Sequence, residues 1–122
     1  MSLSSKPSWR PYASRFRTLS DPTVEIRELR PADLLREGFH ARLNREALDH
    51  TPVVYLIRNN GYADGVPLPL AFANPCLVDL APAYRLRGAR ATAETLDAVL
   101  NAAKASCLAG HGPFILEHII SE

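Results

Sequence analysis

Four stretches of the chain have the hydrophobic pattern of β-strands. Val53 to Arg58 is a short and nearly continuous apolar run, which is typical of a strand buried on both faces of a sheet. Val24 to Leu29 alternates apolar and charged residues instead, as a half-exposed strand does. Phe114 to Ile120 is again mostly apolar, and Gly88 to Ala91 is a candidate for a further short strand. The pattern therefore predicts a sheet that contains both buried and half-exposed strands.

A helical pattern lies between the first two strands. Residues 34–49 carry apolar side chains four positions apart, so we expect one amphipathic helix there. Asp33 is its expected N-cap, and the Thr51-Pro52 pair breaks it before the next strand begins. The apolar stripe of this helix would consist of Leu34, Leu35, Phe39, Leu43, Ala47 and Leu48.

A second helix is expected between Thr92, as its N-cap, and Gly110, as its stop signal. Its apolar residues follow the i, i+3, i+4, i+7 rule. A short helix is also expected within residues 77–84, where Pro82 is tolerated only in the first turn. The stripe of the second helix comprises Leu96, Val99, Leu100, Ala103 and Cys107.

Strands that alternate with helices predict an α/β fold with parallel crossover connections and a small, mostly parallel sheet. The 122 residues are enough for one domain. We expect residues 1–30 to be an irregular or disordered N-terminal segment and residues 31–122 to form the domain. Residues 63–76 contain three prolines and a glycine, so we expect a long loop without regular structure there.

Turn residues end the most buried strand. Asn59, Asn60 and Gly61 follow the apolar run directly; asparagine and glycine tolerate positive φ, and asparagine side chains bond to nearby backbone. In open α/β sheets, ligands bind outside the carboxyl ends of such strands. The sequence therefore predicts a ligand-binding turn with two amide side chains.

Composition excludes several classes of partner. The net charge is +1, which gives no general attraction to nucleic acid or to membrane surfaces, and no apolar run is long enough to span a bilayer. Cys76 and Cys107 are expected to be reduced thiols, which suits the cytoplasm. Residues 1–20 are basic and serine-rich, as a disordered tail or a mitochondrial transit peptide would be, so the mitochondrial matrix is the alternative location.

The turn and its surroundings resemble the cofactor loop of thiamine-diphosphate enzymes. The similarity is greatest to the alpha subunit of the decarboxylating component of 2-oxo acid dehydrogenases, and it covers about residues 38 to 118. The matching segments are Phe39-His40, Leu43-Asn44, Pro52-Val53-Val54, Asn59-Asn60-Gly61-Tyr62-Ala63, Leu80 to Tyr84, Gly88-Ala89-Arg90, Gly112-Pro113 and Leu116-Glu117.

The resemblance implies a partial three-layer thiamine-diphosphate-binding fold. It implies that thiamine diphosphate and Mg²⁺ are the cofactors and that Asn59, Asn60, Gly61 and Tyr62 bind the cofactor. Asn60 would give Mg²⁺ an amide oxygen and Tyr62 a backbone carbonyl. The family carries out oxidative decarboxylation of 2-oxo acids with acyl transfer to lipoamide. Its cofactor lies between the alpha subunit and a beta subunit, which supplies the glutamate that activates the thiamine ring.

The chain departs from the family at the strongest metal ligand. There is no Gly-Asp-Gly motif; residues 30–35 stand in its place, and Asp33 is the nearest carboxylate. Asp33 is thus either a metal ligand or, as we favour, a plain helix cap, while Asp64-Gly65 is expected to be only a turn. We therefore expect no catalytic residue here, little cofactor binding and no turnover by the chain alone. It would be a truncated remnant, or a small subunit that completes an enzyme with a beta-type partner or by self-association.

Two alternative functions, from other classes of protein, stay open. Val24 to Asp33 resembles the opening strand of GNAT acetyltransferases, and Tyr84 to Arg90 resembles their acyl-CoA pyrophosphate loop, although Arg90 stands where a small residue is needed. A non-catalytic α/β interaction module is the other alternative. The histidines His40, His50, His111 and His118 lack the close spacing of a zinc site.

Overall fold

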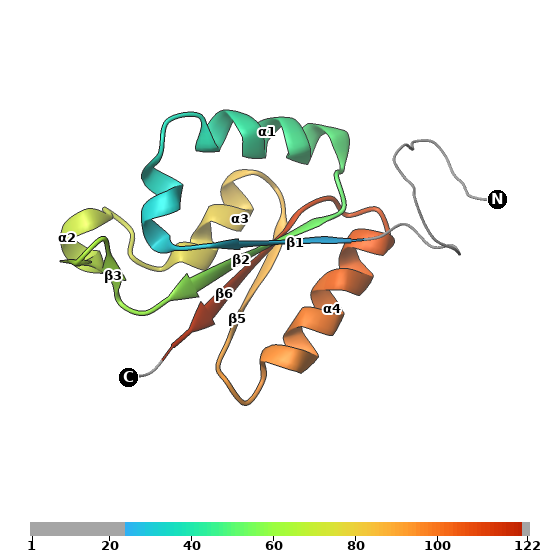
Figure 1. Cartoon of the computed structure of the whole chain (residues 1–122). Coiled ribbons are helices and arrows are strands. Elements are labelled where there is room, and N and C mark those ends of the chain that lie inside the picture. The colour runs from blue at the N-terminus through green and yellow to red at the C-terminus, as the bar shows by residue number, and fades with distance from the viewer. Residues whose placement is uncertain (1–23, 121–122) are drawn as a thin grey trace.

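The computed structural model describes residues 24–120, which form a four-stranded sheet between two layers of helices (Figure 1). The strands lie in the order β1-β2-β6-β5, and every neighbouring pair is parallel. The predicted α/β fold with a small parallel sheet is therefore confirmed. The strands of the sheet are β1 (Glu25–Leu29), β2 (Val53–Asn59), β5 (Arg87–Ala91) and β6 (Phe114–Ile119).

Helical segments make the crossovers that parallel strands require. A 3-10 helix, η1, and the helix α1 connect β1 to β2, and α4 connects β5 to β6. The connection from β2 to β5 contains a two-stranded hairpin, β3–β4, followed by α2, η2 and α3. The bounds are η1 (Pro31–Leu35), α1 (Phe39–Asp49), β3 (Tyr62–Ala63), β4 (Val66–Pro67), α2 (Leu68–Ala71), η2 (Leu77–Asp79), α3 (Leu80–Ala83) and α4 (Leu96–Leu108).

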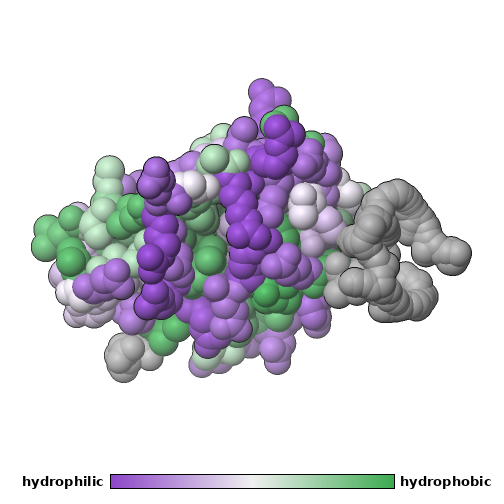
Figure 2. Space-filling view, turned by 45° about the horizontal axis from the view of Figure 1, so that its top comes forward, coloured by the Kyte–Doolittle hydropathy of each residue, from purple (hydrophilic) through white to green (hydrophobic). Residues whose placement is uncertain are grey.

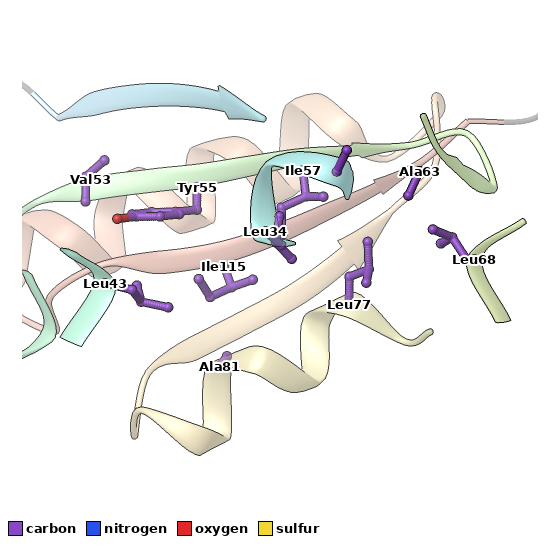
Figure 3. Packing of buried hydrophobic residues seen from close by; sticks show 11 residues of the cluster. Leu34, Leu43, Val53, Tyr55, Ile57, Ala63, Leu68, Leu77, Ala81 and Ile115 are labelled. Atoms are coloured by element: carbon purple, nitrogen blue, oxygen red, sulfur yellow. The ribbon is translucent and has the colours of Figure 1, made fainter. Parts of the chain in front are cut away.

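The central strand β2 is covered on both faces, as its continuous apolar run predicts. Val53, Tyr55 and Ile57 point to the side of α1 and α3, where they pack with Leu43 and Ile115 (Figure 3). The alternate residues of β2 point to α4 on the opposite face, because successive side chains of a strand alternate. The second cluster contains Val54, Leu56, Ala91, Ala103, Cys107, Phe114 and Leu116.

The prediction of one helix over residues 34–49 is wrong in its first part. Residues 31–35 form the separate 3-10 helix η1, and α1 begins only after Gly38, whose φ of 88° interrupts the helical path. Two members of the expected apolar stripe, Leu35 and Leu48, are exposed. Leu43 is the buried residue of α1, so the stripe is narrower than the spacing of leucines suggests.

The second predicted helix is confirmed, but it begins later. Its N-cap is Thr95 rather than Thr92. The hydroxyl of Thr95 accepts a hydrogen bond from the backbone N–H of Thr92 at 2.9 Å, so Thr92 lies in the approach to the helix. Gly110 has a φ of 90° after the end of α4, which suits its predicted role as the stop signal.

Residues 25–29 belong to the sheet. They pair with β2 in parallel from Glu25 opposite Val53 to Leu29 opposite Ile57. The sheet therefore starts before the boundary expected at residue 30, although the division into two regions stays a prediction. The expected tail or transit peptide in residues 1–20 lies outside the described residues. Within residues 24–120, no helix has both the length and the apolar character that crossing a bilayer requires.

A charged network supports the edge of the sheet at β1. Arg27 donates hydrogen bonds at 2.9 Å to the Glu46 carboxylate and to the Tyr55 hydroxyl, and that hydroxyl donates to Glu46. Burial raises the pKa of Glu46, but the hydrogen bonds from Arg27 and Tyr55 outweigh it and hold the pKa below its usual value. Burial and the hydrogen bond to Glu46 raise the pKa of the Tyr55 hydroxyl. The network therefore joins β1, α1 and β2.

We expect the Arg27–Glu46 pair to make stability depend on pH in the acid range. A carboxyl whose pKa is lower in the folded state contributes stability above its unfolded pKa, near 4.5, and loses it as the pH falls through the folded value. Glu46→Gln should therefore lower stability at pH 7 and flatten its dependence on pH below 4.5. Denaturant titrations between pH 7 and acid pH measure this. Glu94→Gln, at an exposed position, should keep the wild-type slope; equal slopes in the wild-type and Glu46→Gln chains would contradict the expectation.

Candidate functional site

The candidate site lies at the carboxyl edge of the sheet. Because all four strands are parallel, β1, β2, β6 and β5 end at the same edge. The predicted turn, Asn59 to Tyr62, follows the end of β2 and leads into the β3–β4 hairpin. The four predicted cofactor residues are therefore contiguous at the place where α/β sheets bind ligands.

Two asparagine side chains shape this turn from within. The Asn59 amide oxygen accepts a hydrogen bond from the backbone N–H of Gly61 at 2.8 Å. The Asn60 amide oxygen accepts one from the N–H of Tyr62 at 3.1 Å. Gly61 has a φ of 92°, which glycine adopts without steric cost. Asn59 is buried whereas Asn60 is exposed, so the two amides face different surroundings.

Asn60 and Tyr62 are the two residues predicted to give a cation an oxygen ligand. An amide oxygen has two lone pairs, so Asn60 can accept from Tyr62 and still bind a second group. Tyr62 lies opposite Pro67 in the hairpin, next to the pair Ala63–Val66 that flanks the two-residue turn. Tyr62 and Pro67 are therefore a non-hydrogen-bonded pair, in which the carbonyl groups point away from the partner strand. The Tyr62 carbonyl is therefore not used in the pairing of β3 with β4.

The prediction of an irregular loop over residues 63–76 is wrong. Asp64 and Gly65 have φ values of 50° and 84°, which are the two positive angles of a type I′ hairpin turn. The hairpin continues into the short helix α2, and the backbone N–H of Leu68 donates to the Gly61 carbonyl at 3.0 Å. Asp64 thus lies in the turn, as expected. The hydrogen bond from Leu68 therefore connects the start of α2 to Gly61 in the candidate site.

Asp33 is not the N-cap of a long helix, and its carboxylate is already occupied. One oxygen accepts from the backbone N–H of Arg30 at 2.8 Å, and the other accepts from Arg36 Nε at 2.8 Å. The hydrogen bond from Arg30, followed by that from Arg36, lowers the pKa of Asp33. Asp33 therefore caps and pairs within η1, and it is poorly suited to bind a metal as well.

The donors of this chain fit Mg²⁺ only in part. Mg²⁺ takes oxygen ligands in octahedral geometry and in nucleotide sites usually combines one or two carboxylates with phosphate oxygens. The turn offers two neutral oxygens, from Asn60 and Tyr62. Within residues 24–120, no group of three or more His, Cys, Asp or Glu side chains is arranged to hold a metal ion. The turn would thus supply two of the six ligands of an octahedral ion, and the carboxylate and phosphate contacts would come from other groups.

Sequence reasoning gave no role to Glu117, which the structure places beside the turn. Glu117 lies near the end of β6 with no exposed surface, and it accepts a hydrogen bond from the Asn59 amide nitrogen at 2.6 Å. One signal was present in the sequence, since Glu117 is an isolated acid within the apolar strand Phe114–Ile119. Its partner could not be identified, because Asn59 is 58 positions away.

Two surface pockets lie away from the turn. One, of about 410 Å³, is lined by Arg27, Arg36 and Arg42 together with Phe39 and Tyr55. The other, of about 280 Å³, lies between η1, α3 and the segment after α2, and includes His40 and Cys76. His40 is exposed, and its Nδ1 forms a hydrogen bond with the Tyr84 hydroxyl at 2.9 Å on the surface. Neither pocket includes Asn59, Asn60, Gly61 or Tyr62.

Comparisons with known proteins identify the family of the chain. The family model of the dehydrogenase E1 component matches residues 37–120. The alpha subunit of acetoin:2,6-dichlorophenolindophenol oxidoreductase from Bacillus subtilis (strain 168) is 34% identical over 82 residues, which are 65% of this chain and 25% of that protein. The chain belongs to the dehydrogenase E1 component family. It spans about a quarter of the length of that relative.

A solved structure shares the fold. It belongs to a Mycobacterium smegmatis protein described as a thiamin diphosphate-dependent enzyme, and it superimposes with a TM-score of 0.61 at 20% identity. The match covers 84% of this chain and 18% of that one. The acetyltransferase reading finds no support, and its expected pyrophosphate loop is partly the strand β5, paired with β6.

Proposed function

We propose that this chain is a partial alpha-type domain of a thiamine-diphosphate-dependent dehydrogenase whose turn, Asn59 to Tyr62, binds the metal and diphosphate end of the cofactor. The observation that carries the proposal is the position of this turn at the carboxyl edge of the sheet, with Asn60 and the Tyr62 carbonyl available as oxygen donors. Membership of the dehydrogenase E1 component family supports it. The family's substrates, 2-oxo acids, are proposed for this chain together with Mg²⁺.

The four residues of the turn would have different roles in binding. Asn60 and Tyr62 would contact the metal, whereas Gly61 lets the backbone approach and Asn59 holds the turn. Thiamine diphosphate, when bound, supplies the carbanion chemistry at the substrate carbonyl. Two carboxylates considered for its activation are unsuited to it, because Asp33 is paired with Arg36 and Glu117 is fully buried. We therefore propose that the activating group comes from outside the described residues, as it would from a beta-type partner.

The surface beside the turn suits such a partner. Tyr62, Val66 and Leu70 are exposed on the β3–β4 hairpin and α2, and Leu35 is exposed on η1 nearby. Figure 2 shows hydrophobic residues gathered at the end of the molecule where α2 and the hairpin lie. Large exposed apolar side chains beside a ligand site favour burial against another subunit. We propose a beta-type dehydrogenase subunit or a second copy in that place, within the cytoplasm.

A turnover assay tests the proposed function. The purified chain is mixed with thiamine diphosphate, Mg²⁺ and a panel of 2-oxo acids, and release of CO₂ is measured. We expect none above background from the chain alone, and we expect release when a beta-type subunit of the family is added. Decarboxylation by the chain alone would contradict the proposal, and so would binding of acetyl-CoA in place of thiamine diphosphate.

A further inference from the structure

Glu117 is a fully buried carboxylate next to the candidate site. It lies on β6, one of the two central strands, opposite Ile57 of β2 and Arg90 of β5, and its side chain has no exposed surface. A buried carboxylate is costly unless hydrogen bonds and an opposite charge compensate for the lost water. The partners of Glu117 therefore indicate why an otherwise apolar strand tolerates it.

Three elements meet at this carboxylate. Oε2 accepts a hydrogen bond from Asn59 Nδ2 at 2.6 Å, at the end of β2. Oε1 accepts one from the backbone N–H of Val78 in η2 at 2.9 Å, and Arg90 Nε of β5 lies 3.4 Å from the same oxygen. Glu117 thus connects the candidate turn to the segment that returns from the hairpin and α2, and to the edge strand.

The orientation of the Asn59 amide depends on Glu117. Asn59 Oδ1 accepts from the N–H of Gly61, so Nδ2 must point the other way, toward Glu117. Rotating the amide by half a turn would place two donors, Nδ2 and the N–H of Gly61, against each other. An acceptor at Glu117 therefore selects the amide orientation that closes the turn at Gly61.

We propose that Glu117 is a positioning residue for the turn that presents Asn60 and Tyr62. Glu117 fixes the Asn59 amide and Asn59 fixes Gly61, and Asn60 Oδ1 and the Tyr62 carbonyl on either side of Gly61 are thereby oriented. The bond to Val78 couples the same carboxylate to η2. The inference rests on the proposed function in one respect, that the turn binds the cofactor. The effect of Glu117 on the conformation of the turn is measurable without any cofactor.

A pair of substitutions isolates this control. Glu117→Gln keeps the size of the side chain but leaves one acceptor oxygen for two donors, Asn59 Nδ2 and the N–H of Val78. Adding Asn59→Asp to Glu117→Gln restores the three hydrogen bonds, because the new carboxylate accepts from Gly61 and from the new amide, whose oxygen accepts from Val78. The ion pair with Arg90 is lost in both variants, so it does not distinguish them. The exposed carboxylate of Glu28, which faces Arg58 at 3.4 Å, gives the matched control Glu28→Gln.

Amide hydrogen exchange gives the readout. In Glu117→Gln, we expect exchange at Gly61 to become at least about tenfold faster, while exchange at Leu56 in the middle of β2 stays near the wild-type rate, because the opening is local. The double variant should return Gly61 toward the wild-type rate, and Glu28→Gln should change neither amide. An unchanged rate at Gly61, an equal acceleration at Gly61 and Leu56, or no recovery in the double variant would overturn the inference.

A second arm uses Mn²⁺ with thiamine diphosphate as a paramagnetic probe. In the wild-type chain we expect broadening of the Asn60 and Tyr62 signals, and in Glu117→Gln we expect most of it to be lost and then recovered in the double variant. Wild-type broadening in Glu117→Gln would overturn the positioning role. If the wild-type chain shows no broadening, the proposed function fails, and the exchange rates alone decide the role of Glu117.

Discussion

Replacing Ile115 by alanine is expected to lower the free energy of unfolding by about 2–5 kcal/mol. Ile115 has no exposed surface and lies in β6 between Tyr55 of β2 and Gly88 of β5. It belongs to the cluster beneath α1 and α3 (Figure 3), so removing three carbon atoms leaves a cavity that the rigid sheet cannot close. Domains are usually stabilised by about 5–15 kcal/mol, so the loss would be a large share of the total.

Chemical denaturation followed by far-ultraviolet circular dichroism measures this loss. Leu70→Ala is the matched control, because Leu70 is 79% exposed on α2 and its truncation should change stability by no more than about 0.5 kcal/mol. If both substitutions cost the same, Ile115 would not be the core residue that the structure shows.

Gly88→Ala is expected to destabilise the chain by about 1–3 kcal/mol through overpacking. A Cβ at Gly88 would lie 2.9 Å from Ala81 Cβ, 3.0 Å from the Ile115 carbonyl oxygen and 3.1 Å from Val78 Cγ2. Val78 lies in η2, Ala81 in α3 and the Ile115 carbonyl in β6, so none of the three atoms is the end of a flexible side chain. The added methyl group would therefore push η2 and α3 away from β5.

The same denaturation experiment checks this second expectation. Arg87→Ala, at the exposed neighbouring position in β5, should stay within about 0.5 kcal/mol of the wild type. Because Val78 also donates its N–H to Glu117, Gly88→Ala should increase amide exchange at Val78 as well. A stabilised Gly88→Ala chain would show that η2 and α3 are not packed as closely as described.

Sequence patterns predicted the buried centre of the fold. The strand β2 is buried on both faces, and a continuous apolar run shows this directly in the sequence. The helix α4 is buried on one face, and its periodic apolar residues show that as directly. The turn at Asn59 to Tyr62 was also predictable, since asparagine and glycine were needed there for local hydrogen bonds and positive φ.

The errors occurred where local geometry overrode spacing. Leu35 and Leu43 share a helical period, but Gly38 with its positive φ separates η1 from α1, and Leu35 becomes exposed. The hairpin over β3 and β4 was missed although Asp64-Gly65 is a recognised type I′ pair, because prolines on its C-terminal side suggested an irregular loop. In both cases the glycine was the decisive signal.

The partners of buried polar groups could not be predicted from residue order. Glu117, Asn59 and Val78 come from three separate elements, and only the sheet register and the return of the chain through η2 bring them together. Likewise, the occupation of Asp33 by Arg30 and Arg36 required the 3-10 geometry of η1. These contacts determine how the turn is held and why the Asp33 carboxylate is already paired.

We propose above all that this chain holds part of a cofactor site, in which the turn Asn59 to Tyr62 gives neutral oxygen donors. Titration of thiamine diphosphate with Mg²⁺, followed residue by residue through amide NMR shifts, tests it most directly. We predict a dissociation constant of about 1 mM or weaker, shifts confined to Asn60, Gly61 and Tyr62, and loss of these shifts in Asn60→Ala. Micromolar affinity for the chain alone, or shifts elsewhere with the turn unaffected, would contradict the account.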